Sequence, residues 1–139
     1  MKNESKLKGK IAVMPCTGIG QVLGTITRQA AYKLCEELRP NTTLLLCLPA
    51  LVRGVQEDID MIENGPVLLI EGCKDRCAEA ALATQKGVAA ETIYLPDVLK
   101  QIGISVTDAH RSTLTADELR VVDHLAELTA QAVDRLYQQ

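Results

Sequence analysis

Three short apolar runs in this chain are each followed by a cysteine, and this pattern limits the possible folds more than any other feature. Cys16 follows IAVMP, Cys47 follows TLLL, and Cys73 follows VLLIEG, with Cys77 a little further on. Runs this short are typical of strands buried on both faces of a parallel sheet. Because the carboxyl ends of parallel strands share the edge where ligands bind, we expect thiols distant in sequence to be gathered there.

Apolar runs and helical patterns alternate along the chain, which predicts one α/β domain over residues 1–139. Strands are expected at 10–14, 43–48, 66–70 and 91–95, and helices at about 20–39, 55–63, 74–86, 96–102 and 115–137. Right-handed crossovers then give a doubly wound, three-layer domain with a four-stranded, mostly parallel sheet of order 2-1-3-4. This is a flavodoxin-like, or Rossmann-like, arrangement.

The first and last long helices are each expected to place an apolar stripe against the sheet. The first stripe consists of Ile19, Val22, Leu23, Ile26, Ala30, Leu34 and Leu38, and the last of Leu119, Val122, Leu125, Ala126, Thr129, Ala132, Val133 and Leu136. Thr115 and Glu118 have the spacing of a capping box, which predicts the start of the last helix.

Composition excludes several classes of function. The net charge is −3 and no basic stripe is present, which argues against nucleic-acid binding. No apolar run reaches the roughly 18 residues of a membrane span, and the polar start MKNESKLKGK does not resemble a signal peptide. We therefore expect a cytoplasmic protein without membrane partners. There, five cysteines favour a metal site plus one spare thiol over disulfides.

The segment Cys73-Lys-Asp-Arg-Cys77 places two thiols four residues apart at a predicted helix start, on one helical face. Unpaired amides there favour thiolates, and Lys74 and Arg76 add positive charge. This pair predicts metal binding or redox chemistry. Cys35 lies in the first helix beside its apolar stripe and is interpreted as the spare core thiol.

Two other motifs suggest weaker alternatives. Gly18, Gly20 and Gly24 resemble a dinucleotide-binding loop, but the acid expected after the second strand is absent. The segment from Cys47 to Arg53 has the C-x5-R spacing of cysteine phosphatases, but it is crowded with Leu and Val. His110 is interpreted as a solvated loop residue and His124 as a surface or hydrogen-bonded histidine, and no catalytic triad is evident.

On these residues the chain resembles the DGC-domain family, a group of zinc-associated proteins named for an Asp-Gly-Cys motif and carrying four potential chelating cysteines. The matching segments are Pro15-Cys16-Thr17-Gly18, Leu46-Cys47-Leu48, and Glu71-Gly72-Cys73 followed by Cys77. Glu71 replaces the Asp of the motif, and Thr17 replaces a common Ser. The resemblance implies zinc as the cofactor and no established reaction.

The leading hypothesis is a zinc site of Cys16, Cys47, Cys73 and Cys77, with a structural, metal-handling or sensing role. Cys47 is the hardest ligand to place, because its strand lies two positions, about 10 Å, from the third strand. The segment 48–54 would have to curl inward. The alternatives are an enzyme with an open zinc site and a free Cys47, a redox pair of Cys73 and Cys77, or an iron–sulfur cluster.

Overall fold

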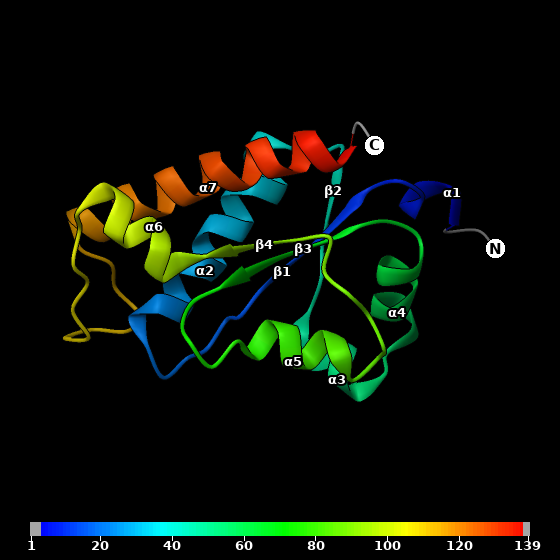
Figure 1. The fold of residues 1–139 in the computed structure, drawn as a ribbon, viewed down its shortest axis with the longest axis horizontal. Helices are drawn as coiled ribbons and strands as arrows, with labels where there is room; N and C mark the ends of the chain where they lie inside the picture. Colours follow the sequence, from blue (N-terminus) through cyan, green and yellow to red (C-terminus); the bar gives the residue numbers. More distant parts are fainter. Residues whose placement is uncertain (1–3, 138–139) are drawn as a thin grey trace.

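Four short strands form one parallel sheet at the centre of the computed structural model, which describes residues 4–137 (Figure 1). The strands are β1 (Ile11–Pro15), β2 (Thr43–Leu45), β3 (Val67–Glu71) and β4 (Glu91–Tyr94). They are ordered β2-β1-β3-β4, and every pairing is parallel. The predicted order and the α/β class are confirmed, and the sheet is entirely parallel.

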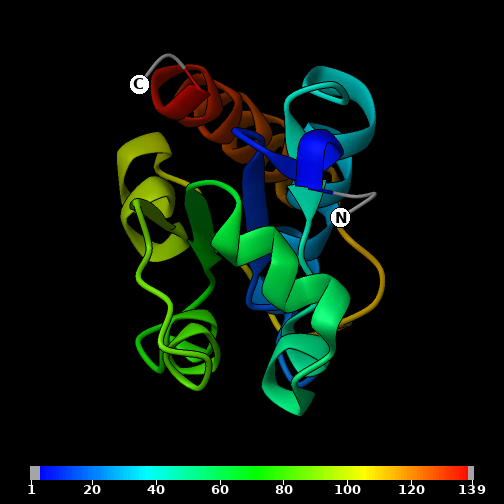
Figure 2. The ribbon, with the colours of Figure 1, turned by 90° about the vertical axis from the view of Figure 1, so that its right-hand side faces the viewer.

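Helices cover both faces of the sheet (Figures 1 and 2). One face is covered by α2 (Val22–Lys33), a π-helical turn that extends it (Leu34–Leu38), α6 (Leu95–Ile102) and α7 (Ala116–Tyr137). The other face is covered by α3 (Leu48–Arg53), α4 (Gln56–Glu63) and α5 (Cys77–Ala83), and α1 (Glu4–Leu7) contacts α4.

The strands separate two aliphatic cores. Ile11 and Val13 of β1 face the core under α2 and α7, whereas Ala12 and Met14 face the core under α3 and α5. All five residues of β1, and all five of β3, are buried. Burial on both faces explains why β1 and the first four residues of β3 are continuously apolar in sequence.

Two predicted stripe residues do not belong to the core. Ile19 is 82% exposed because α2 begins only at Val22, and Leu119 is 53% exposed on the outer side of α7. The capping box is confirmed. The Glu118 amide donates to Thr115 Oγ1 at 3.1 Å, and the Thr115 amide donates to Glu118 Oε1 at 3.0 Å.

The second strand is shorter than predicted, and a helix follows it. β2 ends at Leu45, and residues 48–53 form α3 instead of an inward-curling loop. Pro49 occupies the first turn of α3, where its missing N–H costs nothing, and Gly54 ends the helix with a φ of 85°. Pro49 and Gly54 therefore determine that this segment is a helix, although its apolar run resembles a strand.

Candidate metal and thiol site

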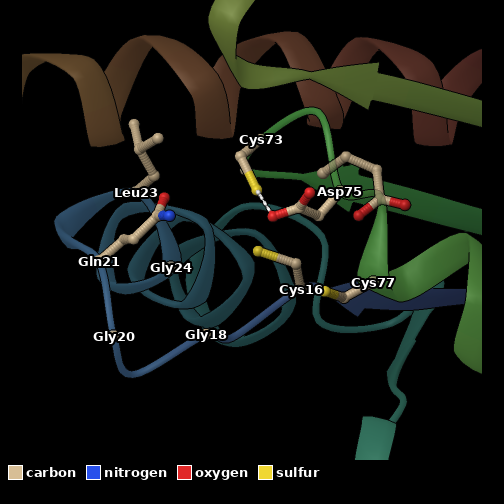
Figure 3. Close-up of a pocket in the computed structure, with 11 residues that line it drawn as sticks. Cys16, Gly18, Gly20, Gln21, Leu23, Gly24, Cys73, Asp75 and Cys77 are labelled. Atoms are coloured by element: carbon tan, nitrogen blue, oxygen red, sulfur yellow. Dashed lines mark hydrogen bonds between the residues drawn. The ribbon is translucent and has the colours of Figure 1, made fainter.

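Three of the predicted ligands line one cavity at the carboxyl edge of the sheet, between the ends of β1 and β3. Cys16 directly follows β1, Cys73 lies in the loop after β3, and Cys77 begins α5. The cavity holds about 180 Å³ and is lined by Cys16, Gly18, Gly20, Gln21, Leu23, Gly24, Glu71, Gly72, Cys73, Asp75 and Cys77. Figure 3 shows that the three thiols come from three different segments, the end of β1, the loop after β3 and the start of α5. This is the topological switch point of the sheet.

Two glycines allow the segments around the cavity to approach closely. A Cβ on Gly72 would lie 2.9 Å from the Cys16 sulfur, and a Cβ on Gly24 would lie 1.8 Å from the Gly18 carbonyl oxygen. The second contact is with backbone and cannot be relieved by turning a side chain. Gly18 and Gly24 therefore have a packing role, because the absence of a side chain on Gly24 lets α2 lie directly against the preceding loop at Gly18.

Cys73 and Cys77 do not share a helical face, which corrects the prediction of a helix from residue 74. α5 begins at Cys77, and the Arg76 amide donates to the Cys73 carbonyl at 3.2 Å in a turn before it. Arg76 has a φ of 50°, in the left-handed region, and its guanidinium lies 4.8 Å from the centre of the Tyr94 ring. The turn, rather than a helix, brings the two thiols to one cavity.

Glu71 holds the start of α5, a role that the sequence did not reveal. Its side chain is completely buried. Oε1 accepts a hydrogen bond from the Ala78 amide at 3.1 Å, and Oε2 accepts one from the Glu79 amide at 2.8 Å. The carboxylate therefore satisfies two free donors at the positive end of the helix dipole. Both oxygens are directed to the helix, so Glu71 acts here as a cap of α5.

The electrostatics of Cys77 also differ from the prediction. The residue as a whole is exposed, but desolvation of its thiol, together with the negative groups of Cys73, Cys16, Glu71 and Asp75, raises the pKa of that thiol. The helix start was expected to favour the thiolate, but the Glu71 carboxylate already occupies its amides. Arg76 is directed toward Tyr94 and lies 3.8 Å from Glu79 Oε2. A metal-free Cys77 is consequently biased toward the neutral thiol.

The other two cavity thiols have polar neighbours. Cys73 Sγ lies 3.7 Å from Asp75 Oδ2, the dashed contact in Figure 3, and Cys16 Sγ lies 3.5 Å from Thr27 Oγ1. Within residues 4–137, no three His, Cys, Asp or Glu side chains are close enough together to hold a metal ion as they stand. The three thiols share a cavity, but their sulfur atoms are not yet converged on one point.

Cys47 lies apart from the other three. It is exposed directly before α3, and it lines a different cavity together with residues of β1, α2 and β2. Its amide donates to Oδ1 of the buried Asp58 at 3.0 Å, which fixes the entry to α3. Its role as a zinc ligand stays a prediction. Arg53 lies in the last turn of α3, so the C-x5-R segment is helical and does not form a loop that cradles phosphate.

A loop over residues 103–115 packs beside the N-terminus of α2. Asp108 Oδ1 accepts a hydrogen bond from the Val22 amide at 3.1 Å, and Arg111 Nε donates to the Gly20 carbonyl at 2.7 Å. Asp108 therefore caps α2 from a distant part of the chain, which no local motif could indicate. His110 is exposed on this loop, as predicted, and His124 is exposed on α7.

The fold and the cavity define an α/β domain with a doubly wound parallel sheet and three cysteines gathered at its switch point. The sequence profile of the DGC domain matches residues 12–122. The chain therefore belongs to the DGC-domain family. No curated protein and no solved structure matches it. Among the described residues, no helix combines the length and apolar character that a membrane crossing requires.

Proposed function

We propose that this chain is a zinc-binding protein whose metal lies in the carboxyl-edge cavity, held by Cys16, Cys73 and Cys77. The observation that best supports the proposal is that Cys16 lines one cavity with Cys73 and Cys77, which are more than fifty residues away from it in sequence. Its role would be structural, or in handling or sensing the metal.

The chemistry of the donors fits this metal. Thiolates are preferred ligands of zinc, with Zn–S distances of about 2.3 Å, and bound zinc would offset the charge of the clustered sulfurs. A cysteine side chain has a single rotatable bond, so rotation between staggered positions can bring sulfurs of one cavity together. Glu71 fixes the start of α5, which carries Cys77, and Gly72 leaves room for the Cys16 sulfur.

Cys47 decides whether the site is closed or open. As a fourth ligand it would give a saturated, structural site, and the β2–α3 connection would have to move to deliver it. If it stays in its own cavity, a coordination position is left for water or a substrate, which is the arrangement of zinc enzymes. The exposed position of Cys47 is the specific observation that favours this second candidate. A redox pair of Cys73 and Cys77 is a third candidate.

Zinc affinity measured by competition with a chromophoric chelator tests these possibilities. Loss of a residue that only hydrogen-bonds to a metal ligand costs about 10- to 100-fold in metal affinity. Removal of a ligand itself, in Cys16→Ser, Cys73→Ser or Cys77→Ser, should therefore weaken binding by more than about 100-fold. Cys35→Ser is the matched control and should bind like the parent. Cys47→Ser separates a closed site, in which affinity falls similarly, from an open one, in which it is retained. If none of the three cavity variants weakened binding, the proposal would be wrong.

A cytoplasmic location is part of the same proposal. All five cysteines are free thiols in the structure, which suits a reducing compartment and a metal that needs thiolates. A free-thiol count on anaerobically purified, chelator-treated protein should return about five thiols per chain, as the sequence contains. A count about two lower would instead support the redox pair.

A further inference from the structure

A second cavity lies at the same edge of the sheet, between α2 and the connection from β2 to α3. Its volume of about 480 Å³ falls inside the range of about 300–1,000 Å³ typical of small-molecule sites. It is lined by Pro15, Thr17, Ile19, Arg28, Ala31, Tyr32, Leu45, Leu46, Cys47, Leu48 and Pro49. None of these residues lines the thiol cavity, so the two spaces are separate.

The walls of this second cavity are mostly hydrocarbon. Ala31 and Leu46 form a buried part of the lining. Two larger side chains are open to solvent, since Ile19 is 82% exposed and Tyr32 is 38% exposed. Large apolar side chains left exposed around a cavity commonly mark a binding surface. The lining therefore favours a ligand with an apolar portion.

Arg28 is the one cation in the lining, and it has no carboxylate partner among residues 4–137. Arg28 is half-buried, and its guanidinium donates through Nη2 to the Thr17 carbonyl at 3.3 Å. By contrast Lys33, on the same helix, pairs with Asp123 at 2.6 Å. A guanidinium has five N–H donors in a planar fork that matches a carboxylate. Arg28 therefore has donors left to bind an anion inside an apolar cavity.

We propose that the second cavity binds a small amphipathic carboxylate. Its carboxylate pairs with Arg28, and its hydrocarbon part packs on the aliphatic lining and on the Tyr32 ring. A singly charged, planar anion fits this lining better than a phosphate does, because the lining offers only one cation. The bound molecule covers Cys47, which lines the same cavity. This site uses none of the three thiols proposed to hold zinc, and it requires only that Cys47 stay in its own cavity.

Protection of Cys47 from iodoacetamide tests the proposal. The full chain is alkylated in the presence of a chelator, so that metal cannot shield any thiol, and peptide mass spectrometry follows each cysteine. Octanoate is the probe, 1-octanol is the neutral control of equal chain length, and inorganic phosphate is the control without a tail. At about ten times its Kd, octanoate should slow alkylation of Cys47 about tenfold. Octanol should protect less, phosphate should not protect, and Cys73 should react at an unchanged rate.

Two substitutions locate the anion. Arg28→Gln should abolish the difference between octanoate and octanol. Arg53→Gln is the matched control, because Arg53 is an exposed cation of α3 outside the lining, and it should leave protection intact. Equal protection by octanoate and octanol in the parent, or no protection at all, would overturn the proposal even if Arg28→Gln failed to fold. If octanoate protected Cys47 equally well in a folded Arg28→Gln variant, the proposal would also be wrong.

Discussion

The carboxylate of Glu71 accepts a 2.8 Å hydrogen bond from the backbone amide of Glu79, and so joins the end of β3 to the first turn of α5. A second bond, to the Ala78 amide, completes the cap. Because Cys73 lies in the loop between these elements and Cys77 begins the helix, the position of both thiols depends on this buried group. It is the feature of the site on which we expect stability to depend most.

Glu71→Gln tests this cap. The substitution replaces one acceptor oxygen by an NH2 group that faces a backbone donor, and hydrogen bonds to charged groups contribute about 1.5–3 kcal/mol. The free energy of unfolding, measured with urea, should fall by roughly 2 kcal/mol. Glu79→Gln is the control, because its side chain is 62% exposed, and it should stay within about 0.5 kcal/mol of the parent. Equal effects of the two substitutions would contradict the capping role.

Because α2 lies so close to its preceding loop, we expect an alanine substitution to destabilise the protein at Gly24 but not at Gly20. In Gly24→Ala the new Cβ meets the Gly18 carbonyl, whereas in Gly20→Ala it meets nothing within 4 Å. Overpacking against backbone should cost Gly24→Ala roughly 1–3 kcal/mol in urea unfolding. Gly20→Ala should be nearly neutral. If both variants were as stable as the parent, the loop would not be packed as described.

Cys35 should be the slowest thiol to react. Burial raises its pKa to about 11, against a smaller opposing effect of a hydrogen bond with Thr43. At pH 8 only about a thousandth of Cys35 would be thiolate, the form that reacts with iodoacetamide. In chelator-treated protein, peptide mapping should show Cys47 alkylated long before Cys35. The reverse order would be inconsistent with the burial of Cys35 beside the core.

The contact between Arg39 and Asp134 predicts a pH dependence of stability. Two hydrogen bonds of 2.8 Å from the guanidinium lower the pKa of the Asp134 carboxyl. Because this pKa is lower in the folded than in the unfolded state, the ionised carboxylate stabilises the fold at pH values above the unfolded pKa of about 3.9. The contribution is lost as the pH falls through the lower pKa of the folded state. The pair lies at the surface and is only half-buried, so solvent screens it and the effect should be within about 1 kcal/mol. Urea unfolding of Asp134→Asn should show a deficit at neutral pH that disappears in acid. A deficit independent of pH would argue against this linkage.

Much of the fold could be predicted from the sequence, because buried parallel strands are largely apolar. The apolar runs at residues 11–15 and 66–70 have this character, and they correctly located β1 and β3. The run ending at Leu48 was misleading, since an apolar segment of that length does not distinguish a strand from the start of a helix. Pro49 was the overlooked signal, because proline is common in the first turn of a helix.

The arrangement of the site could be predicted only in part. Strand order placed Cys16, Cys73 and Cys77 at one edge, and the structure brings these three to one cavity. The distance between β2 and β3 already marked Cys47 as the difficult member. The caps made by Glu71 and Asp108 could not be found, because each carboxylate meets amides of another segment that only tertiary folding brings close.

The zinc content of anaerobically purified protein tests the central proposal most directly. Elemental analysis of protein prepared without chelator should find about one zinc per chain in the parent and in Cys35→Ser. A variant with Cys16, Cys73 and Cys77 all changed to Ser should contain essentially none, with circular dichroism as the check on its secondary structure. A parent that is folded and free of zinc, or a triple variant that retains the metal, would contradict the assignment of these three thiols.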